Sequence, residues 1–274
     1  MDWPRIKTGH HALNPNICLA VGRQGLAVGR ETWNLVTVGD AVADTNLFRR
    51  GGIQYFPIFT YPEENQAEGT HLGKQCNLTK EFIAEFSLKS KMKFVLDDRG
   101  DCIKTFGPED VFNYIYAILH SPTYRTRYAQ FLKSDFPRIP LTSNRILLRA
   151  LCEKGRELAD FHLMRRFGRS MTTFPVANGS IVENVRYEEP SGKTHGRVWI
   201  NKAQYFEGIS SEIWNFHIGG YQVSEKWLKD REGRVLGYDE IRHYERIVAA
   251  LFETIQLIAE IDATINAAGG WPIK

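Results

Sequence analysis

The stretch that decides the fold lies in the middle of the chain and reads Tyr114-Ile115-Tyr116-Ala117-Ile118-Leu119-His120-Ser121-Pro122-Thr123-Tyr124-Arg125. Its apolar residues, together with Val111 and Phe112, recur at i, i+3 and i+4, which predicts a helix that begins at Pro108. Ser121-Pro122 then predicts the N-cap and the first-turn proline of a second helix, which runs to about residue 134 and buries Tyr124, Tyr128, Phe131 and Leu132. Two helices joined so closely form an αα-hairpin.

Towards the N-terminus the pattern changes to short β-prone runs. Residues 17–21, 35–38 and 53–61 are such runs, and Pro57 in the third predicts an edge strand or a bulge. A polar loop follows over 62–77, and then a helix over about 79–90 that carries Phe82, Ile83 and Phe86 on one stripe.

Beyond the central stretch, the two prolines of Phe136-Pro137-Arg138-Ile139-Pro140 forbid a helix. We expect a long helix over about 143–167, strands within 171–206 with a turn at Ser191-Gly192-Lys193, and a strand at 214–218 halted by Gly219-Gly220. A short helix at 224–230 and a last helix at 239–265 complete the pattern. The sequence therefore predicts an α+β fold: mixed β-sheet subdomains with a central αα-hairpin and a long C-terminal helix.

Composition places the chain among compact proteins. It has 274 residues, 43% of them hydrophobic, which excludes collagen-like, low-complexity and disordered chains. No apolar run approaches the ~20 residues of a membrane helix, and the N-terminus lacks the apolar segment of a signal peptide. The four cysteines have neither CxxC nor zinc-site spacing, so we expect no structural metal, reduced thiols and a cytoplasmic location.

Charge is uneven along the chain. The formal net charge is +3, yet residues 121–169 alone hold 11 basic and 4 acidic side chains, and nine of the basic ones are arginines. Arginine suits bidentate contacts to phosphate and guanine, although two helices with arginine-rich polar faces would show the same excess. We therefore expect one compact region in three parts: a β-rich recognition part (1–106), a basic helical connector (107–168), and a β-hairpin with C-terminal helices (169–274).

The catalytic motifs that a self-sufficient enzyme would need are missing from the sequence. It has no Walker A loop, no dinucleotide-binding glycine pattern, no Asn/Asp-Pro-Pro-aromatic loop of amino-methylating enzymes and no nucleophile elbow. We expect His10-His11 to be solvated and His120 to interact with the C-terminus of its own helix. For His217, a core role and a functional role both stay open. We expect no catalytic residue and no metal site.

Three stretches resemble one protein family. They are Tyr55-Phe56-Pro57-Ile58-Phe59-Thr60-Tyr61-Pro62, the central stretch with its continuation to Asp135-Phe136-Pro137-Arg138-Ile139-Pro140, and Ile218-Gly219-Gly220-Tyr221-Gln222-Val223-Ser224-Glu225-Lys226-Trp227-Leu228-Lys229-Asp230-Arg231. From about residue 16 to 265 the chain is similar to the C-terminal specificity region of type ISP restriction-modification enzymes, and related single-chain type IIG enzymes share the pattern. Ile58-Phe59 stands where the family usually has Leu-Tyr, a conservative departure.

The resemblance implies a non-catalytic role in a longer polypeptide. The chain would recognise double-stranded DNA, position a target adenine for the N6-adenine methyltransferase of its parent, and direct the parent's nuclease and translocase. S-adenosylmethionine, ATP and Mg²⁺ would bind in those upstream domains, and this chain would hold no cofactor. The alternative is a structural interaction module that packs the methyltransferase and other domains without reading bases.

Amide and guanidinium side chains are the groups suited to contacting base edges and phosphates. We expect base contacts from turns near the early strands and from the 62–77 loop: Arg23, Gln24, Asn46, Arg49, Arg50, Lys74 and Gln75. We expect phosphate contacts from the basic segment and the short C-terminal helix: Arg125, Arg127, Lys133, Arg138, Arg145, Arg149, Lys226 and Lys229. Two alternatives stay open, namely that the first set is ordinary polar surface and that Arg138 clamps a carboxylate between helices.

Overall fold

A three-stranded antiparallel sheet opens the fold. In the computed structural model, the described residues are 6–23, 32–48, 52–62, 73–169, 171–176, 179–191 and 195–273. Strand β1 (Cys18–Gly22) lies between β2 (Val36–Gly39) and β3 (Ile53–Pro57), with Ala20 opposite both Thr37 and Tyr55. Because β3 is an edge strand, the missing N–H of Pro57 costs no ladder bond, as the sequence predicts.

Short elements surround this sheet. They are α1 (Ile6–Ala12), the antiparallel pair β4 (Phe59–Thr60) and β5 (Gln75–Cys76), helix α2 (Lys80–Ser90), and the parallel pair β6 (Lys93–Phe94) and β7 (Thr105–Phe106). Strand β5 lies inside the region predicted as a loop. Helix α1 is held to the sheet by its histidines, since His10 Nε2 lies 3.0 Å from the Pro62 carbonyl and His11 Nδ1 accepts from the Tyr61 N–H. These histidines are therefore not simply solvated, contrary to expectation.

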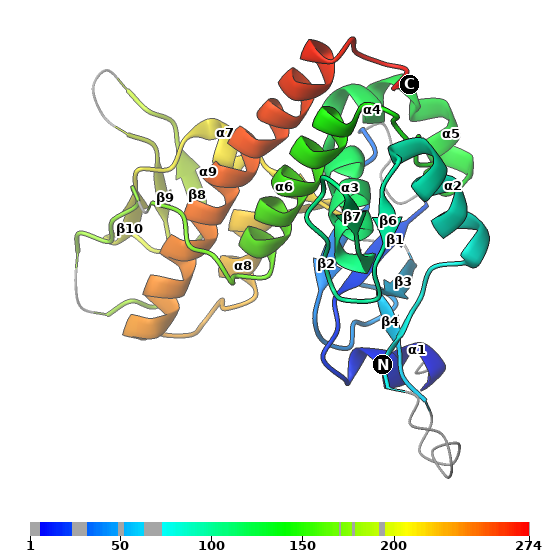
Figure 1. Cartoon of the computed structure of the whole chain (residues 1–274). Helices are drawn as coiled ribbons and strands as arrows, with labels where there is room; N and C mark the ends of the chain where they lie inside the picture. Colours follow the sequence, from blue (N-terminus) through cyan, green and yellow to red (C-terminus); the bar gives the residue numbers. More distant parts are fainter. Residues whose placement is uncertain are drawn as a thin grey trace.

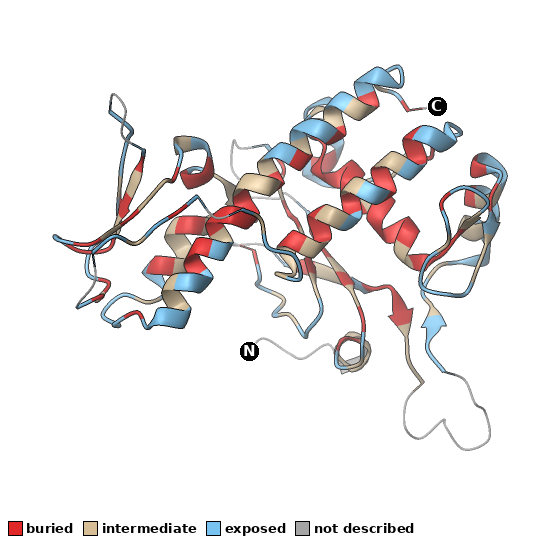
Figure 2. Ribbon diagram, turned by 60° about the vertical axis from the view of Figure 1, so that its left-hand side comes forward, coloured by how far each residue is buried: buried red, intermediate tan, exposed pale blue. Residues whose placement is uncertain are grey.

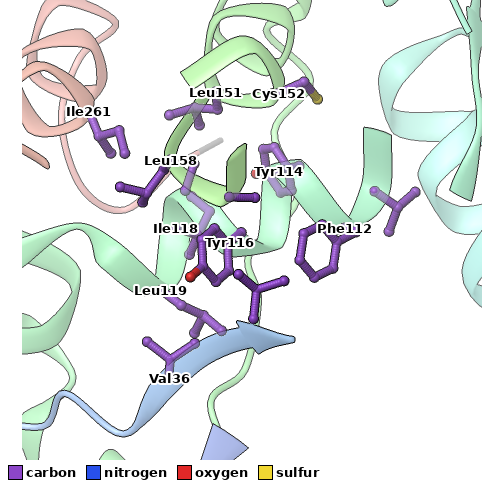
Figure 3. Packing of buried hydrophobic residues seen from close by; sticks show 14 of the residues in the cluster. Val36, Phe112, Tyr114, Tyr116, Ile118, Leu119, Leu151, Cys152, Leu158 and Ile261 are labelled. Carbon is purple, nitrogen blue, oxygen red and sulfur yellow. The ribbon is translucent and has the colours of Figure 1, made fainter. Parts of the chain in front are cut away.

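The main core forms around helix α3 (Pro108–His120), which begins at the predicted proline. Its buried side chains lie between β2 on one side and helices α6 (Arg145–His162) and α9 (Tyr238–Ala267) on the other, as Figure 3 shows for Val36, Tyr116 and Ile261. Gly155 allows the close approach of α6, because a Cβ there would lie 1.9 Å from the Asn113 carbonyl oxygen.

The second helix of the predicted αα-hairpin is broken. Ser121 caps it as expected, its Oγ accepting from the Tyr124 N–H at 3.1 Å. However, α4 (Pro122–Arg127) ends where Tyr128 takes φ −102° and ψ 17°, and α5 (Ala129–Ser134) follows. The Tyr128 ring packs edge-on against Trp271, a distant contact that local sequence does not reveal. Phe131, expected in the core, is 69% exposed.

Helix α6 is shorter at both ends than the sequence predicts. Asn144 caps it through its side chain, which accepts from the N–H groups of Ile146 and Leu147. The helix ends at His162, and Met164 then takes a left-handed conformation with φ 54°. A left-handed residue is a common end to a helix, so the chain turns away before residue 167.

A second core gathers the C-terminal elements. They are the antiparallel sheet β10-β9-β8, with β8 (Arg186–Glu188), β9 (Arg197–Trp199) and β10 (Tyr205–Glu207), followed by α7 (Ser211–Trp214), β11 (His217–Ile218), β12 (Tyr221–Gln222) and α8 (Val223–Lys229). Ile218 of β11 packs against the first core instead. Strands β8 and β9 pair antiparallel as a hairpin requires, although Gly192 and Lys193 of the predicted turn lie outside the described residues.

The segment 214–218, predicted as one strand, forms the end of a helix and a two-residue strand. Trp214 ends helix α7, and the β11 pair is confined to His217 and Ile218. Gly219 and Gly220 have φ values of 60° and 81°, and they form the two-residue turn into β12. Positive φ at both central residues is the signature of a type I′ hairpin turn, so these glycines reverse the chain.

Helix α9 runs through both cores (Figures 1 and 2). Tyr244 and Val248, in its N-terminal half, are buried in the second core, whereas Ile261 and Ile265 are buried in the first. We refer to the two cores with their surrounding elements as the first lobe and the second lobe. No described helix is long and apolar enough to cross a membrane. The α+β class and the long last helix are confirmed, while the three-part division remains a prediction.

Candidate nucleic-acid interface

The residues predicted to contact bases fall at two ends of the first sheet. Arg23 follows β1 and is exposed, with its guanidinium carbon 5.0 Å from the centre of the Phe136 ring. Asn46 is also exposed and lies at the same end, because the neighbouring Thr45 carbonyl accepts from the Ile53 N–H. Gln24, Arg49 and Arg50 lie outside the described residues.

Lys74 and Gln75 lie at the other end of that sheet. Gln75 pairs with Thr60 in β4, beyond the point where Pro57 stands opposite Cys18. The Lys74 ammonium forms an ion pair with Asp98 and lies 4.1 Å from the centre of the Phe59 ring. The structure therefore does not bring these two residues together with Arg23 and Asn46.

Two of the predicted phosphate contacts are exposed cations with no ion pair among the described residues. Arg127 ends α4 and Lys133 lies on α5. Nearby, Arg138 is 90% exposed at its side chain and lies 3.6 Å from the Asp135 carboxylate. This is a local contact within one connection, and the alternative of a carboxylate clamp between helices is wrong.

Four further predicted phosphate contacts have protein partners. Arg145 donates to the Ile103 carbonyl. The others form ion pairs one helical turn apart: Arg149 with Glu153 at 2.9 Å, Lys226 with Asp230 at 2.5 Å, and Lys229 with Glu225 at 2.9 Å. Exposed pairs of this kind contribute about 0–1 kcal/mol, so they can be exchanged for phosphate contacts at little cost. Lys226 and Lys229 lie on α8, in the second lobe.

Arg125 differs from all of these because it is half-buried. Its Nε donates to the Leu119 carbonyl at 2.7 Å, and its guanidinium carbon lies 5.7 Å from the centre of the Trp33 ring. Burial lowers the pKa of Arg125 to about 10, against the favourable influence of Tyr116 and Asp262. The group is still charged at neutral pH, and no ion pair to it is formed within the described part of the chain.

Arg125 lines an open cleft of about 590 Å³ between the lobes. The first lobe contributes Thr32, Trp33, Asn34 and Arg125 to this cleft, and the second lobe contributes Ser211, Glu212, Asn215, Phe216 and His217. We call it the interlobe cleft. Residues so far apart in sequence share no spacing signal, which is why sequence reasoning found Arg125 but missed Trp33, Asn34 and Asn215.

His217, whose role the sequence leaves open, forms part of the joint between the lobes. Its Nδ1 lies 2.6 Å from the Asn215 carbonyl, and its own carbonyl accepts from Asn34 Nδ2 at 3.2 Å. The Gly219 N–H also donates to the Asn34 carbonyl. His217 is half-buried, and these bonds give it a structural role on the cleft wall.

Behind Arg125 lies a buried chain of polar side chains. His162 Nε2 lies 3.0 Å from Thr254 Oγ1, which donates to the Ala250 carbonyl, so His162 Nε2 carries the proton. The Tyr116 hydroxyl then donates to His162 Nδ1 at 2.5 Å. Burial, with the charge of Arg125 second, lowers the pKa of His162 to about 4. This arrangement requires a neutral imidazole.

His120 lies beside this chain and behaves as predicted. Its Nδ1 is 2.8 Å from the Tyr116 carbonyl, in the last turn of its own helix. Burial holds the pKa of His120 well below its usual value. Among the described residues, no group of three histidine, cysteine or acidic side chains could hold a metal ion.

Known proteins give this geometry a context. The family model of the Type ISP C-terminal specificity domain matches residues 1–260. No curated protein sequence matches the chain. Three solved structures have a similar fold: a nuclease-deletion mutant of the Type ISP restriction-modification enzyme LlaGI in complex with a DNA substrate mimic, the ATP-dependent Type ISP restriction-modification enzyme LlaBIII bound to DNA, and the DrdV–DNA complex.

These structures share the fold at low sequence identity. The LlaGI chain is 19% identical with a TM-score of 0.58, LlaBIII 18% with 0.62, and DrdV 20% with 0.64. The matches cover 90%, 90% and 91% of this chain, but 21%, 16% and 25% of the respective relatives. This chain thus spans a quarter or less of their length. It belongs to the family of Type ISP C-terminal specificity domains, the target-recognition part of Type ISP restriction-modification enzymes.

Proposed function

We propose that this chain recognises a specific sequence in double-stranded DNA on behalf of a restriction-modification enzyme. The observation that carries the proposal is the family match over residues 1–260, joined to relatives of the same fold that were solved with DNA or a DNA mimic. In this role the chain positions the target adenine for the N6-adenine methyltransferase of the parent polypeptide. It also directs the nuclease and translocase of that polypeptide.

The distribution of cations supports a division of labour on the DNA. Arg127 and Lys133 are exposed on adjacent short helices, where they fix the position of the duplex through its phosphates. Arg23 and Asn46 lie at one end of the first sheet and offer donor and acceptor groups to base edges. Sequence reading in this proposal comes from that end of the sheet, with Gln24, Arg49 and Arg50 as further candidates.

Catalysis in this proposal belongs to other domains. S-adenosylmethionine, ATP and Mg²⁺ bind in the methyltransferase and helicase or nuclease domains of the parent. The contribution of this chain is to recognise the DNA sequence at which those domains act.

One observation favours a second function, that of a structural module which packs the other domains. An apolar groove of about 290 Å³ opens between the first sheet and α3, with Phe56, Ile115 and Phe136 among its lining residues. Phe56 is 46% exposed and its ring packs edge-on against Phe136, so the lining is a contiguous apolar surface of the kind that a partner can cover. A domain of the parent could be held there without any base being read.

Exchanging residues 17–80 between two full-length relatives of different specificity separates these functions. If this part of the first lobe reads bases, the methylated sequence follows the exchanged segment, as sequencing of modified adenines in genomic DNA will show. If the chain only packs domains, the methylated sequence stays that of the recipient enzyme.

A further inference from the structure

The interlobe cleft resembles a ligand site, because two of its polar groups have hydrogen-bonding atoms that no described residue satisfies. Its volume of about 590 Å³ lies within the range of small-ligand pockets, about 300–1,000 Å³. Both lobes line it, and Asn34 ties them together at its edge through hydrogen bonds to His217 and Gly219. A ligand bound there touches both lobes.

The first incomplete group is the guanidinium of Arg125. Its Nε is satisfied by the Leu119 carbonyl, and the described residues supply its two terminal nitrogens with neither an ion pair nor a hydrogen bond. Asp262, the carboxylate that raises its pKa, accepts hydrogen bonds from Ser121 and Thr123 instead. A partly desolvated guanidinium fork without a carboxylate is suited to a phosphate, which accepts two parallel N–H bonds.

The second incomplete group is the side-chain oxygen of Asn34. Asn34 Oδ1 is buried and has no hydrogen-bond partner within the described structure, which is unfavourable unless a donor arrives. The amide orientation is fixed, because Nδ2 donates to the His217 carbonyl. A ligand that satisfies this site therefore needs an N–H donor as well as an anionic group. Phe216 adds an apolar side chain to the lining.

We propose that the interlobe cleft binds one nucleotide, with its phosphate on the Arg125 guanidinium and an N–H group of its base on Asn34 Oδ1. The choice of a nucleotide rests on the proposed function, since each DNA base carries both a phosphate neighbour and an N–H donor. Glu212 is the acidic member of the lining and lies exposed on α7, in the second lobe. Its negative charge repels the phosphate and weakens binding. The nucleotide comes either from a DNA strand or from the free pool.

Titration of the whole chain with dCMP and with inorganic phosphate tests the site. We expect dCMP to bind at least tenfold more tightly than phosphate, because it satisfies both groups. Asn34→Leu should bring dCMP down to the affinity of phosphate and leave phosphate unchanged. Arg125→Lys should weaken both ligands at least tenfold, and Glu212→Gln should strengthen both. Arg156→Gln, which removes an exposed cation of α6 that does not line the cleft, is the matched control and should change neither.

Folding of the variants is checked by circular dichroism, and hydrogen exchange of the wild-type chain provides a readout without any substitution. Addition of dCMP should protect amides in 32–34 and 211–217 and leave those in β6 and β7 unchanged. Equal affinity of dCMP and phosphate in the wild type, or no protection in the cleft at millimolar dCMP, would overturn the proposal.

Competition with a DNA duplex identifies the source of the nucleotide. Displacement of dCMP by the duplex assigns the site to a DNA strand, and duplex binding without displacement assigns it to a free nucleotide. If dCMP does not bind while the duplex does, the cleft proposal fails and the proposed function stands. If dCMP binds and no duplex does, the proposed function fails instead.

Discussion

At the scale of single residues, Gly155 allows helices α3 and α6 to approach closely. Its missing side chain leaves room for the Asn113 carbonyl of α3, which a Cβ would meet at 1.9 Å. Gly155→Ala should force α3 and α6 apart and lower the free energy of unfolding by about 1–3 kcal/mol, measured by urea denaturation. The control is Gly9→Ala in α1, where nothing lies within 4 Å of the new Cβ. There alanine should raise stability by up to about 1 kcal/mol. A gain at both positions would contradict the packing described.

A second residue-scale prediction concerns His162. Its pKa is about 4 in the folded protein and near 6.5 when unfolded, so below pH 6.5 the unfolded chain binds the extra proton. Stability is therefore full above pH 6.5 and falls as the pH drops towards 4, by at most about 1.4 kcal/mol per pH unit from this group. Denaturation at pH 7.5, 6 and 5 measures the loss.

His162→Gln should flatten that part of the pH dependence, because glutamine does not titrate. Gln256→Ala changes an exposed side chain that does not titrate and should leave the curve as it is. A wild-type stability that rises between pH 7 and 5 would show that His162 is not buried as a neutral group.

Sequence predicts the residues that act locally and misses those that act at a distance. Pro108, Ser121 and Thr79 are signalled by position, and each lies at a helix start as expected. Arg125 is recognisable as a cation, but its burial depends on Trp33, which is 92 residues away, and on the second lobe. A partner so distant leaves no trace in local spacing.

At the scale of elements, Asp262 joins α9 to the start of α4. Its carboxylate accepts from the Thr123 N–H at 3.0 Å and from the hydroxyls of Ser121 and Thr123. Asp262→Ala leaves these donors without their partner and should lower the free energy of unfolding by about 1–3 kcal/mol. Gln256→Ala, at an exposed position of the same helix, should change it by less than about 0.5 kcal/mol. Equal effects in urea denaturation would contradict the joint.

Element boundaries show the same limit of local reasoning. Helices α3, α8 and α9 lie within a few residues of their predicted bounds because their apolar periodicity is long or their caps are clear. The helix after Ser121 is interrupted at Tyr128, where the ring packs on Trp271. The predicted strand at 214–218 becomes the end of α7 and a tight hairpin, since Ser210 caps α7 by accepting from the Ile213 N–H.

At the scale of the whole molecule, α9 couples the two lobes. Val248 is buried in the second core and Ile261 in the first. Val248→Ala and Ile261→Ala both weaken packing along one continuous helix, by about 2–5 kcal/mol for the isoleucine. Either substitution should increase hydrogen exchange in both β1 and β9, as peptide-level mass spectrometry will show. Loosening confined to β9 in Val248→Ala would mean that the lobes unfold independently.

At the same scale, the sequence predicts the fold class and the family because it carries three long signature motifs. The α+β class and the family assignment were both within reach, because the motifs around Tyr55, Tyr114 and Ile218 are long. Arg127 and Lys133 are exposed, and their contact with DNA stays a prediction, whereas the interlobe cleft needs two lobes that only tertiary packing brings together.

DNA binding through exposed cations underlies the proposed function, and the salt dependence of that binding tests it directly. Fluorescence anisotropy of a labelled duplex with the chain and its methyltransferase partner, at 50 to 200 mM salt, gives the slope of log K against log salt. We predict that this slope is negative, with about −0.9 for each phosphate contact. Arg127→Gln with Lys133→Gln should make the slope shallower by about 2. A flat salt response, or no duplex binding at all, would contradict the account.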